Sequence, residues 1–87
     1  MSSYLEAVAG LGCVVCKRMG LGYAAAEVHH VESIRDSKSD YATVPLCPDH
    51  HRGPNGVHGL SRRGFETRYK LSDVDLLALT AEALWKR

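Results

Sequence analysis

Hydrophobic and polar residues follow three different patterns along the chain, which together predict an α+β fold. Apolar residues at helical spacing, among them Tyr4, Leu5 and Val8, predict a helix over residues 2–9. Residues 23–31 and 41–46 are apolar segments of the length and composition of strands. They flank a polar segment, residues 32–40, which we expect to be a loop.

The last part of the chain has the clearest helical pattern, over residues 72–86. Ser72 can cap this helix, and Asp75 stands three residues later, where the partner residue of a capping box belongs. The apolar stripe that we expect to face the core consists of Val74, Leu77, Ala78, Ala81, Leu84 and Trp85. Leu76 and Leu79 lie partly off this stripe, which would suit either a wider core or a contact with a second copy.

The size and composition of the chain limit what it can be. With 87 residues, of which 45% are hydrophobic, it makes one small globular domain over residues 1–87, with its core within residues 13–69. A domain this small often needs a metal or a disulfide for stability. The sequence contains neither a signal-peptide pattern nor an apolar run of about 20 residues. We therefore expect a cytoplasmic protein with no membrane partner.

The three cysteines follow the spacing of metal ligands. Cys13 and Cys16 are separated by two residues, and so are Cys47 and His50. Each pair can bind one side of a tetrahedral ion, and together they predict a structural zinc held by three thiolates and one imidazole. If these cysteines were only small buried apolar residues, neither the spacing nor the histidine at the fourth position would be explained.

Four histidines remain, and two of them are immediate neighbours of each other, His29 and His30. Neighbours on a strand point to opposite faces, so one of this pair can bind a metal while the other faces outward as a base. His51 should diverge by about 100° from His50 on a helix that Pro48 can open. A lone histidine is usually a surface or core residue, but this set predicts a second metal site.

Charged residues indicate a polyanionic partner. The net charge is only +1, but the stretch after His50 is basic, and Arg52, Arg62 and Arg63 are candidate contacts to phosphates. Such contacts position DNA without selecting a sequence, so we expect low sequence specificity and strongly salt-dependent binding. The alternative is an ordinary solvated surface with scattered charges.

The motifs together resemble those of a known family. A histidine pair at a strand end, a loop, and then Val44-Pro45-Leu46-Cys47 followed by His50-His51 is similar to the HNH nucleases, and in particular to the phage recombination-enhancement (Ref-like) type. Lys38-Ser39-Asp40 and the later His58 belong to the same likeness, which covers roughly residues 13–69. The resemblance implies a small zinc-stabilised ββα-metal (His-Me finger, HNH) domain, here with a C-terminal helix.

The resemblance also implies a role for each histidine. His30 would be the general base, whereas His29, His51 and His58 would hold the catalytic metal. Many family members have an asparagine where this chain has Ala42. Asp40 is the nearest polar residue, and we expect it to orient the loop or the base.

The implied function is a metal-dependent DNA endonuclease, encoded by a phage or prophage. Imidazole ligands suit Zn, Mn, Ni or Co, and Mg is less natural with so few carboxylates. A recombinase or another DNA-processing protein of the phage or host is a plausible partner for so small a domain. The alternative is a non-catalytic zinc-binding module that binds nucleic acid or protein.

Overall fold

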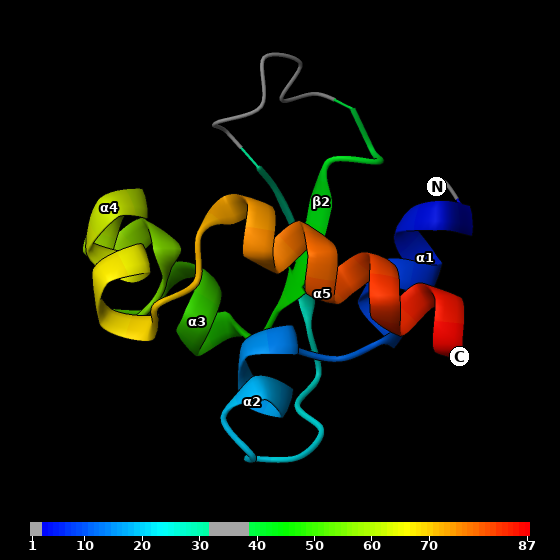
Figure 1. Cartoon of the computed structure of the whole chain (residues 1–87), viewed down its shortest axis with the longest axis horizontal. Coiled ribbons are helices and arrows are strands. Elements are labelled where there is room, and N and C mark those ends of the chain that lie inside the picture. Colours follow the sequence, from blue (N-terminus) through cyan, green and yellow to red (C-terminus); the bar gives the residue numbers. More distant parts are fainter. Residues whose placement is uncertain (1–2, 32–38) are drawn as a thin grey trace.

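The computed structural model describes residues 3–31 and 39–87, which form an α+β fold. Most of the predicted loop at 32–40 lies outside the described residues. A two-stranded sheet stands at the centre, and helices surround it (Figure 1). The elements in chain order are α1 (Ser3–Gly10), α2 (Val14–Arg18), β1 (Glu27–His30), β2 (Thr43–Leu46), α3 (Pro48–Arg52), α4 (Val57–Tyr69) and α5 (Asp73–Lys86).

The sheet is antiparallel and short. Glu27 pairs with Leu46 at one end, and His30 pairs with Thr43 at the other. Both strands are shorter than the segments predicted from the sequence, although they lie inside them. All four residues of β2 are buried, and the strand contacts α1, α2 and α5. In β1 the side chains alternate between faces, so Glu27 and His29 share a face that His30 does not.

The buried core connects the sheet to the helices. It contains the three cysteines together with apolar residues of α2, β2, α4 and α5 and two residues that lie between elements: Val14, Val15, Val31, Val44, Leu46, Val57, Phe65, Leu71 and Leu76. Val8 of α1 is also fully buried. α5 crosses in front of β2 (Figure 1) and contacts α1 and α2 as well. The cysteines therefore lie within the apolar core and not at its edge.

The C-terminal helix begins as predicted but turns a different face to the core. Ser72 Oγ accepts a hydrogen bond from the Asp75 amide at 3.1 Å, and Asp75 Oδ2 accepts one from the Ser72 amide at 2.9 Å. The predicted apolar stripe was wrong, because Val74 is 69% exposed and Trp85 is 89% exposed. Leu76, one of the residues thought to lie partly off the stripe, is fully buried instead.

Helix α4 was not predicted, and close backbone packing places it against α3. A Cβ atom on Gly56 would lie 2.6 Å from the Asp49 carbonyl oxygen, and one on Gly59 would lie 2.9 Å from Pro54. Only glycine allows this approach. The helix is kinked at Ser61, whose φ of 66° and ψ of 166° are strained for a non-glycine residue.

In the described part of the chain, no helix has the length and apolar character needed to cross a membrane.

Candidate metal centres

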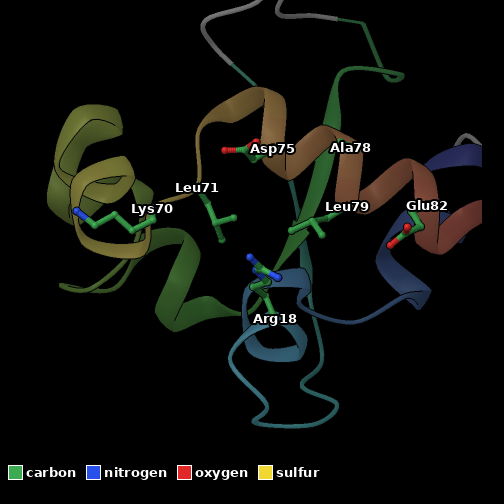
Figure 2. A pocket seen from close by; sticks show the side chains of 7 residues that line it. All are labelled: Arg18, Lys70, Leu71, Asp75, Ala78, Leu79 and Glu82. Atoms are coloured by element: carbon green, nitrogen blue, oxygen red, sulfur yellow. The ribbon is translucent and has the colours of Figure 1, made fainter.

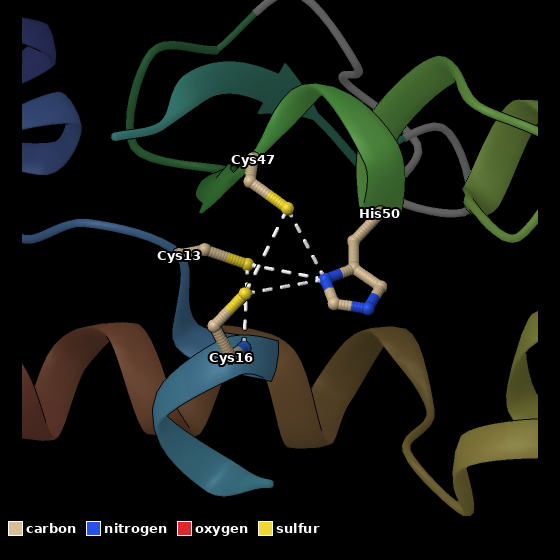
Figure 3. A group of neighbouring side chains, drawn as sticks. All are labelled: Cys13, Cys16, Cys47 and His50. Carbon is tan, nitrogen blue, oxygen red and sulfur yellow. Dashed lines mark hydrogen bonds between the residues drawn. The ribbon is translucent and has the colours of Figure 1, made fainter. Parts of the chain in front are cut away.

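Four predicted ligands lie together where two short helices begin. Cys13 is the N-cap of α2 and Cys16 lies in its first turn, whereas Cys47 is the N-cap of α3 and His50 lies in that helix. Figure 3 shows the three sulfur atoms and His50 Nδ1 pointing toward one another. The Cys16 amide also donates to Cys13 Sγ at 3.4 Å, as expected where a backbone turns around a thiolate. We call these four residues the cage.

The distances within the cage fit a tetrahedral ion. A zinc ion with bonds of about 2.3 Å to sulfur and 2.0 Å to nitrogen requires sulfurs about 3.8 Å apart and sulfur–nitrogen distances of about 3.5 Å. Cys16 Sγ and Cys47 Sγ are 3.8 Å apart. His50 Nδ1 lies 3.6, 3.5 and 3.2 Å from the sulfurs of Cys13, Cys16 and Cys47. The cage can therefore bind a metal such as zinc without rearrangement.

The electrostatics of the cage also suit a bound cation. Burial, followed by hydrogen bonding with Cys13 and Cys47, raises the pKa of the Cys16 thiol to about 12. Three sulfurs this close can all be thiolates only if a positive charge lies between them. Burial lowers the pKa of His50, which keeps its imidazole neutral and able to bind metal. All four residues are buried, so the cage leaves no open position for a substrate.

Helix α4 closes the cage from outside. The Tyr69 ring meets the His50 ring edge to face, with 5.4 Å between ring centres. Tyr69 also donates from its hydroxyl to the Asn55 carbonyl oxygen at 2.8 Å, so that it bridges the end of α4 and the turn before this helix. Burial raises the pKa of Tyr69, which therefore remains a neutral donor.

Three further predicted ligands converge from three different elements. His29 comes from β1, His51 from α3 and His58 from α4, and each offers a ligand atom within 4.8 Å of the others. Their ring centres are 5.1, 5.4 and 4.9 Å apart. Imidazoles that share one tetrahedral ion at about 2.0 Å have ring centres about 5 Å apart. We call these residues the histidine triad.

Exposure increases across the triad, which makes it an open site. His29 is buried, His51 is partly buried and His58 is exposed. Three imidazoles leave at least one coordination position for water or substrate, as in catalytic metal sites. The triad therefore fits a divalent cation that can reach a substrate, in contrast to the closed cage.

A carboxylate that the sequence analysis missed supports the triad. Glu27 Oε1 accepts a hydrogen bond from His51 Nδ1 at 2.9 Å. Arg52 Nε and Nη2 donate to the same carboxylate over 2.8 to 3.1 Å. The Arg52 hydrogen bonds, and then the His51 hydrogen bond, lower the pKa of Glu27 to about 2. Glu27 stands two residues before His29 on the same strand face, and this spacing was the available signal.

The proposed base and its neighbour lie beside the triad on the other strand face. His30 Nε2 and Asp40 Oδ1 are 3.4 Å apart, and their side chains are 39% and 43% exposed. Thr43 Oγ1 donates to the Asp40 carbonyl oxygen at 2.7 Å, which holds the turn that carries Asp40. Ala42, at the position of the family's asparagine, is buried and apolar. The structure thus pairs His30 with Asp40, the two predicted catalytic residues.

The predicted phosphate contacts differ in their surroundings. Arg62 and Arg63 are exposed on α4, four and five residues after His58. Arg52 is also exposed, but two of its nitrogens are bound to Glu27. A surface pocket elsewhere is lined by Arg18, Lys70, Leu71, Asp75, Ala78, Leu79 and Glu82 (Figure 2). It contains acids as well as bases and none of the predicted site residues, so it has no evident part in this chemistry.

A family comparison agrees with these features. Residues 2–85 match the family described as "Recombination enhancement, RecA-dependent nuclease". The chain belongs to this family. The match covers nearly the whole chain and confirms the Ref-like resemblance that the motifs indicated. No curated protein and no solved structure gave a significant match.

Proposed function

We propose that the chain is an HNH-type endonuclease, which hydrolyses phosphodiester bonds in DNA with low sequence specificity and needs a divalent metal. The main support is the convergence of His29, His51 and His58 on one point beside a closed cysteine-rich cage. The order β1, β2, α3 is consistent with a ββα-metal motif that carries His29 on its first element and His51 on its last, while His58 comes from the next helix, α4. We further propose that residues 1–87 act as one nuclease domain.

The histidine triad would hold the catalytic metal. Zn, Mn, Ni and Co suit imidazole ligands, and Mg suits them less. A divalent cation bound there supplies Lewis-acid stabilisation of the charge that develops on the leaving 3′ oxygen. The cage would hold a structural zinc, which contributes to folding and not to turnover.

His30 would act as the general base, oriented by Asp40. If His30 Nε2 donates to Asp40 Oδ1, its Nδ1 atom carries the lone pair that can accept a proton from water. The oxygen of that water then bonds to phosphorus as the bond to the 3′ oxygen breaks. The hydrogen bond of 3.4 Å is long, as such bonds often are before a substrate binds.

DNA would lie across the exposed side of the triad. Arg62 and Arg63 follow His58 on α4 and would contact phosphates, which positions DNA without selecting a sequence. The family description names RecA, so we propose that DNA held by RecA, or by a similar recombinase, is the substrate. From the resemblance to phage proteins, we also propose that a phage or prophage encodes the chain.

Plasmid cleavage tests this function. Zinc-loaded wild type is incubated with each divalent cation and one of two DNA substrates. The first is supercoiled plasmid, and the second is RecA-coated single-stranded DNA paired to its complement. We expect wild type to nick or cut with at least one cation. His30→Ala, prepared in parallel as a control for contaminating nucleases, should cut about 10² to 10⁴ times more slowly.

Two results would contradict the proposal. The first is equal cleavage by wild type and His30→Ala. The second is DNA binding without cleavage by wild type under every condition, which would favour a non-catalytic zinc module instead.

A further inference from the structure

The sequence suggests that Arg52 contacts phosphate, but its hydrogen bonds point to another role. Its Nε atom lies 3.0 and 3.1 Å from the two carboxylate oxygens of Glu27, and its Nη2 atom lies 2.8 Å from Oε2. This bidentate contact, in which two guanidinium nitrogens bind both carboxylate oxygens, fixes the plane of the carboxylate. Because the Arg52 side chain is 66% exposed, we expect the ion pair to add little to stability.

The same carboxylate sets the orientation of His51. Glu27 Oε1 is an acceptor, so the hydrogen bond of 2.9 Å requires a proton on His51 Nδ1. A neutral His51 then has its lone pair on Nε2. In metal sites, a histidine that binds the metal through one ring nitrogen usually donates a hydrogen bond from its other ring N–H to such an outer partner.

The backbone holds Glu27 firmly in place for this task. Glu27 pairs with Leu46 in the sheet, and Leu46 is completely buried in the core. His29 stands two residues later on the same face, so one strand carries both a triad member and the support for another. His51 and Arg52 are adjacent on α3, and the carboxylate therefore links β1 to α3 next to the triad.

We propose that Arg52 and Glu27 form a positioning pair, in which Arg52 orients Glu27 and Glu27 holds His51 with Nε2 available to the metal. Arg52 then acts through Glu27 and not on a phosphate. The inference rests on the proposed function in that it assumes a metal at the triad. It adds two residues to that site and assigns Arg52 a different role from Arg62 and Arg63.

The first measurement is metal affinity at the triad. Protein with zinc in the cage is titrated with Co²⁺, and the visible absorption of histidine-bound cobalt gives its Kd. We expect Glu27→Ala to weaken binding about 10- to 100-fold, the usual effect of losing an outer partner. Glu27→Gln should restore much of the affinity, because its amide oxygen can still accept from His51 Nδ1.

A double-mutant cycle separates the two possible roles of Arg52. Arg52→Ala should weaken cobalt binding in the wild-type background and have no further effect in Glu27→Ala. The salt dependence of DNA binding should stay unchanged in Arg52→Ala. In the matched Arg62→Ala variant the slope of log K against log salt should fall by about 0.9, the value for one phosphate contact.

Nitrogen NMR gives a readout that needs no metal at the triad. With zinc only in the cage, wild-type His51 should carry its proton on Nδ1, and Glu27→Ala should shift the population toward the Nε2–H form. The proposal is overturned if His51 has the same tautomer in both proteins, or if Arg52→Ala lowers the salt slope by about 0.9 while cobalt binding is unchanged.

The controls distinguish this inference from the proposed function. If wild type binds cobalt and cuts DNA but Glu27→Ala binds cobalt equally well, only the positioning role fails. If wild type neither binds cobalt at the triad nor cuts DNA, the function fails, and with it the metal-directed role of the pair.

Discussion

The cage and the histidine triad meet at neighbouring residues, His50 and His51, yet they differ in nearly every physical respect. The four cage residues are buried and come from the first turns of α2 and α3. The triad comes from β1, α3 and α4, and its members range from buried to exposed. A helix turns by about 100° per residue, so adjacent histidines can serve two separate sites.

This contrast separates stability from reactivity. A closed set of four ligands satisfies a zinc ion completely and adds its binding energy to folding. An open set of three leaves room for a substrate, but its geometry depends on the packing of three separate elements. Among the described residues, the two non-glycine positions with positive φ, Ser61 and Lys70, both lie in or at the end of α4, which carries His58.

The largest expected effect comes from opening the cage. Cys47→Ser should unfold the domain, because a structural zinc contributes roughly 10 to 16 kcal/mol in small peptides, as much as the whole stability of most domains. Circular dichroism and zinc content measure this together. A folded, zinc-free Cys47→Ser protein would show that the apolar core suffices without the cage.

Replacing each of the neighbouring histidines in turn sharpens the contrast. His50→Ala should lose zinc and structure, whereas His51→Ala should keep both and lose cobalt binding at the triad together with DNA cleavage. Thermal melting, zinc stoichiometry and plasmid nicking distinguish the two variants. If both variants unfolded, or both stayed folded and active, the division between a structural and a catalytic site would be wrong.

Relieving the strain in α4 should stabilise the protein. Ser61→Gly removes a backbone strain of about 1 to 3 kcal/mol, while the lost hydrogen bond from the Gly64 amide to Ser61 Oγ costs a few tenths. We expect the Tm to rise by roughly 4 to 8 °C. The matched control Arg62→Gly, at a position with helical φ and ψ, should lower the Tm instead.

The smallest effect is expected at the start of α5, which supports the cage side of the molecule. Ser72→Ala removes the cap and should destabilise the domain by about 1 kcal/mol. Cobalt affinity at the triad should not change, because the main contacts of α5 in the described residues are with α1, α2 and β2. The control Ser72→Asp retains a capping acceptor and should have a Tm close to that of wild type. An altered cobalt Kd in Ser72→Ala would contradict this prediction, because it would show that the start of α5 affects the triad.

Local patterns were sufficient for some features of the fold but not for others. The capping box at Ser72 and Asp75 located the start of α5, because both hydrogen bonds join residues three apart. The face of α5 was predicted wrongly, since apolar residues lie around much of the helix and only the position of β2 selects Leu76. Helix α4 escaped prediction because glycines within it and just before it disfavour a helix, and packing of Val57 and Phe65 in the core holds it.

The candidate site shows the same limit. The spacing of Cys13, Cys16, Cys47 and His50 indicates one ion, because each pair spans a single turn of chain. Glu27 carries only a weak signal, its spacing of two residues from His29, since its contacts to His51 and Arg52 join residues 24 and 25 positions apart. Arg52 looked like Arg62 and Arg63 in sequence, and only the contact with β1 sets it apart.

The sequence by itself determined the family, the two pairs of cage ligands and the histidines available for a second site, because these depend on residue type and on short spacings. The tertiary structure decided which residues share a site and how open that site is. Those properties depend on the packing of α3 against β1 and of α4 against α3, where glycines at 56 and 59 let the α4 backbone approach α3 and the turn after it. Such approaches join distant segments, and no local pattern records them.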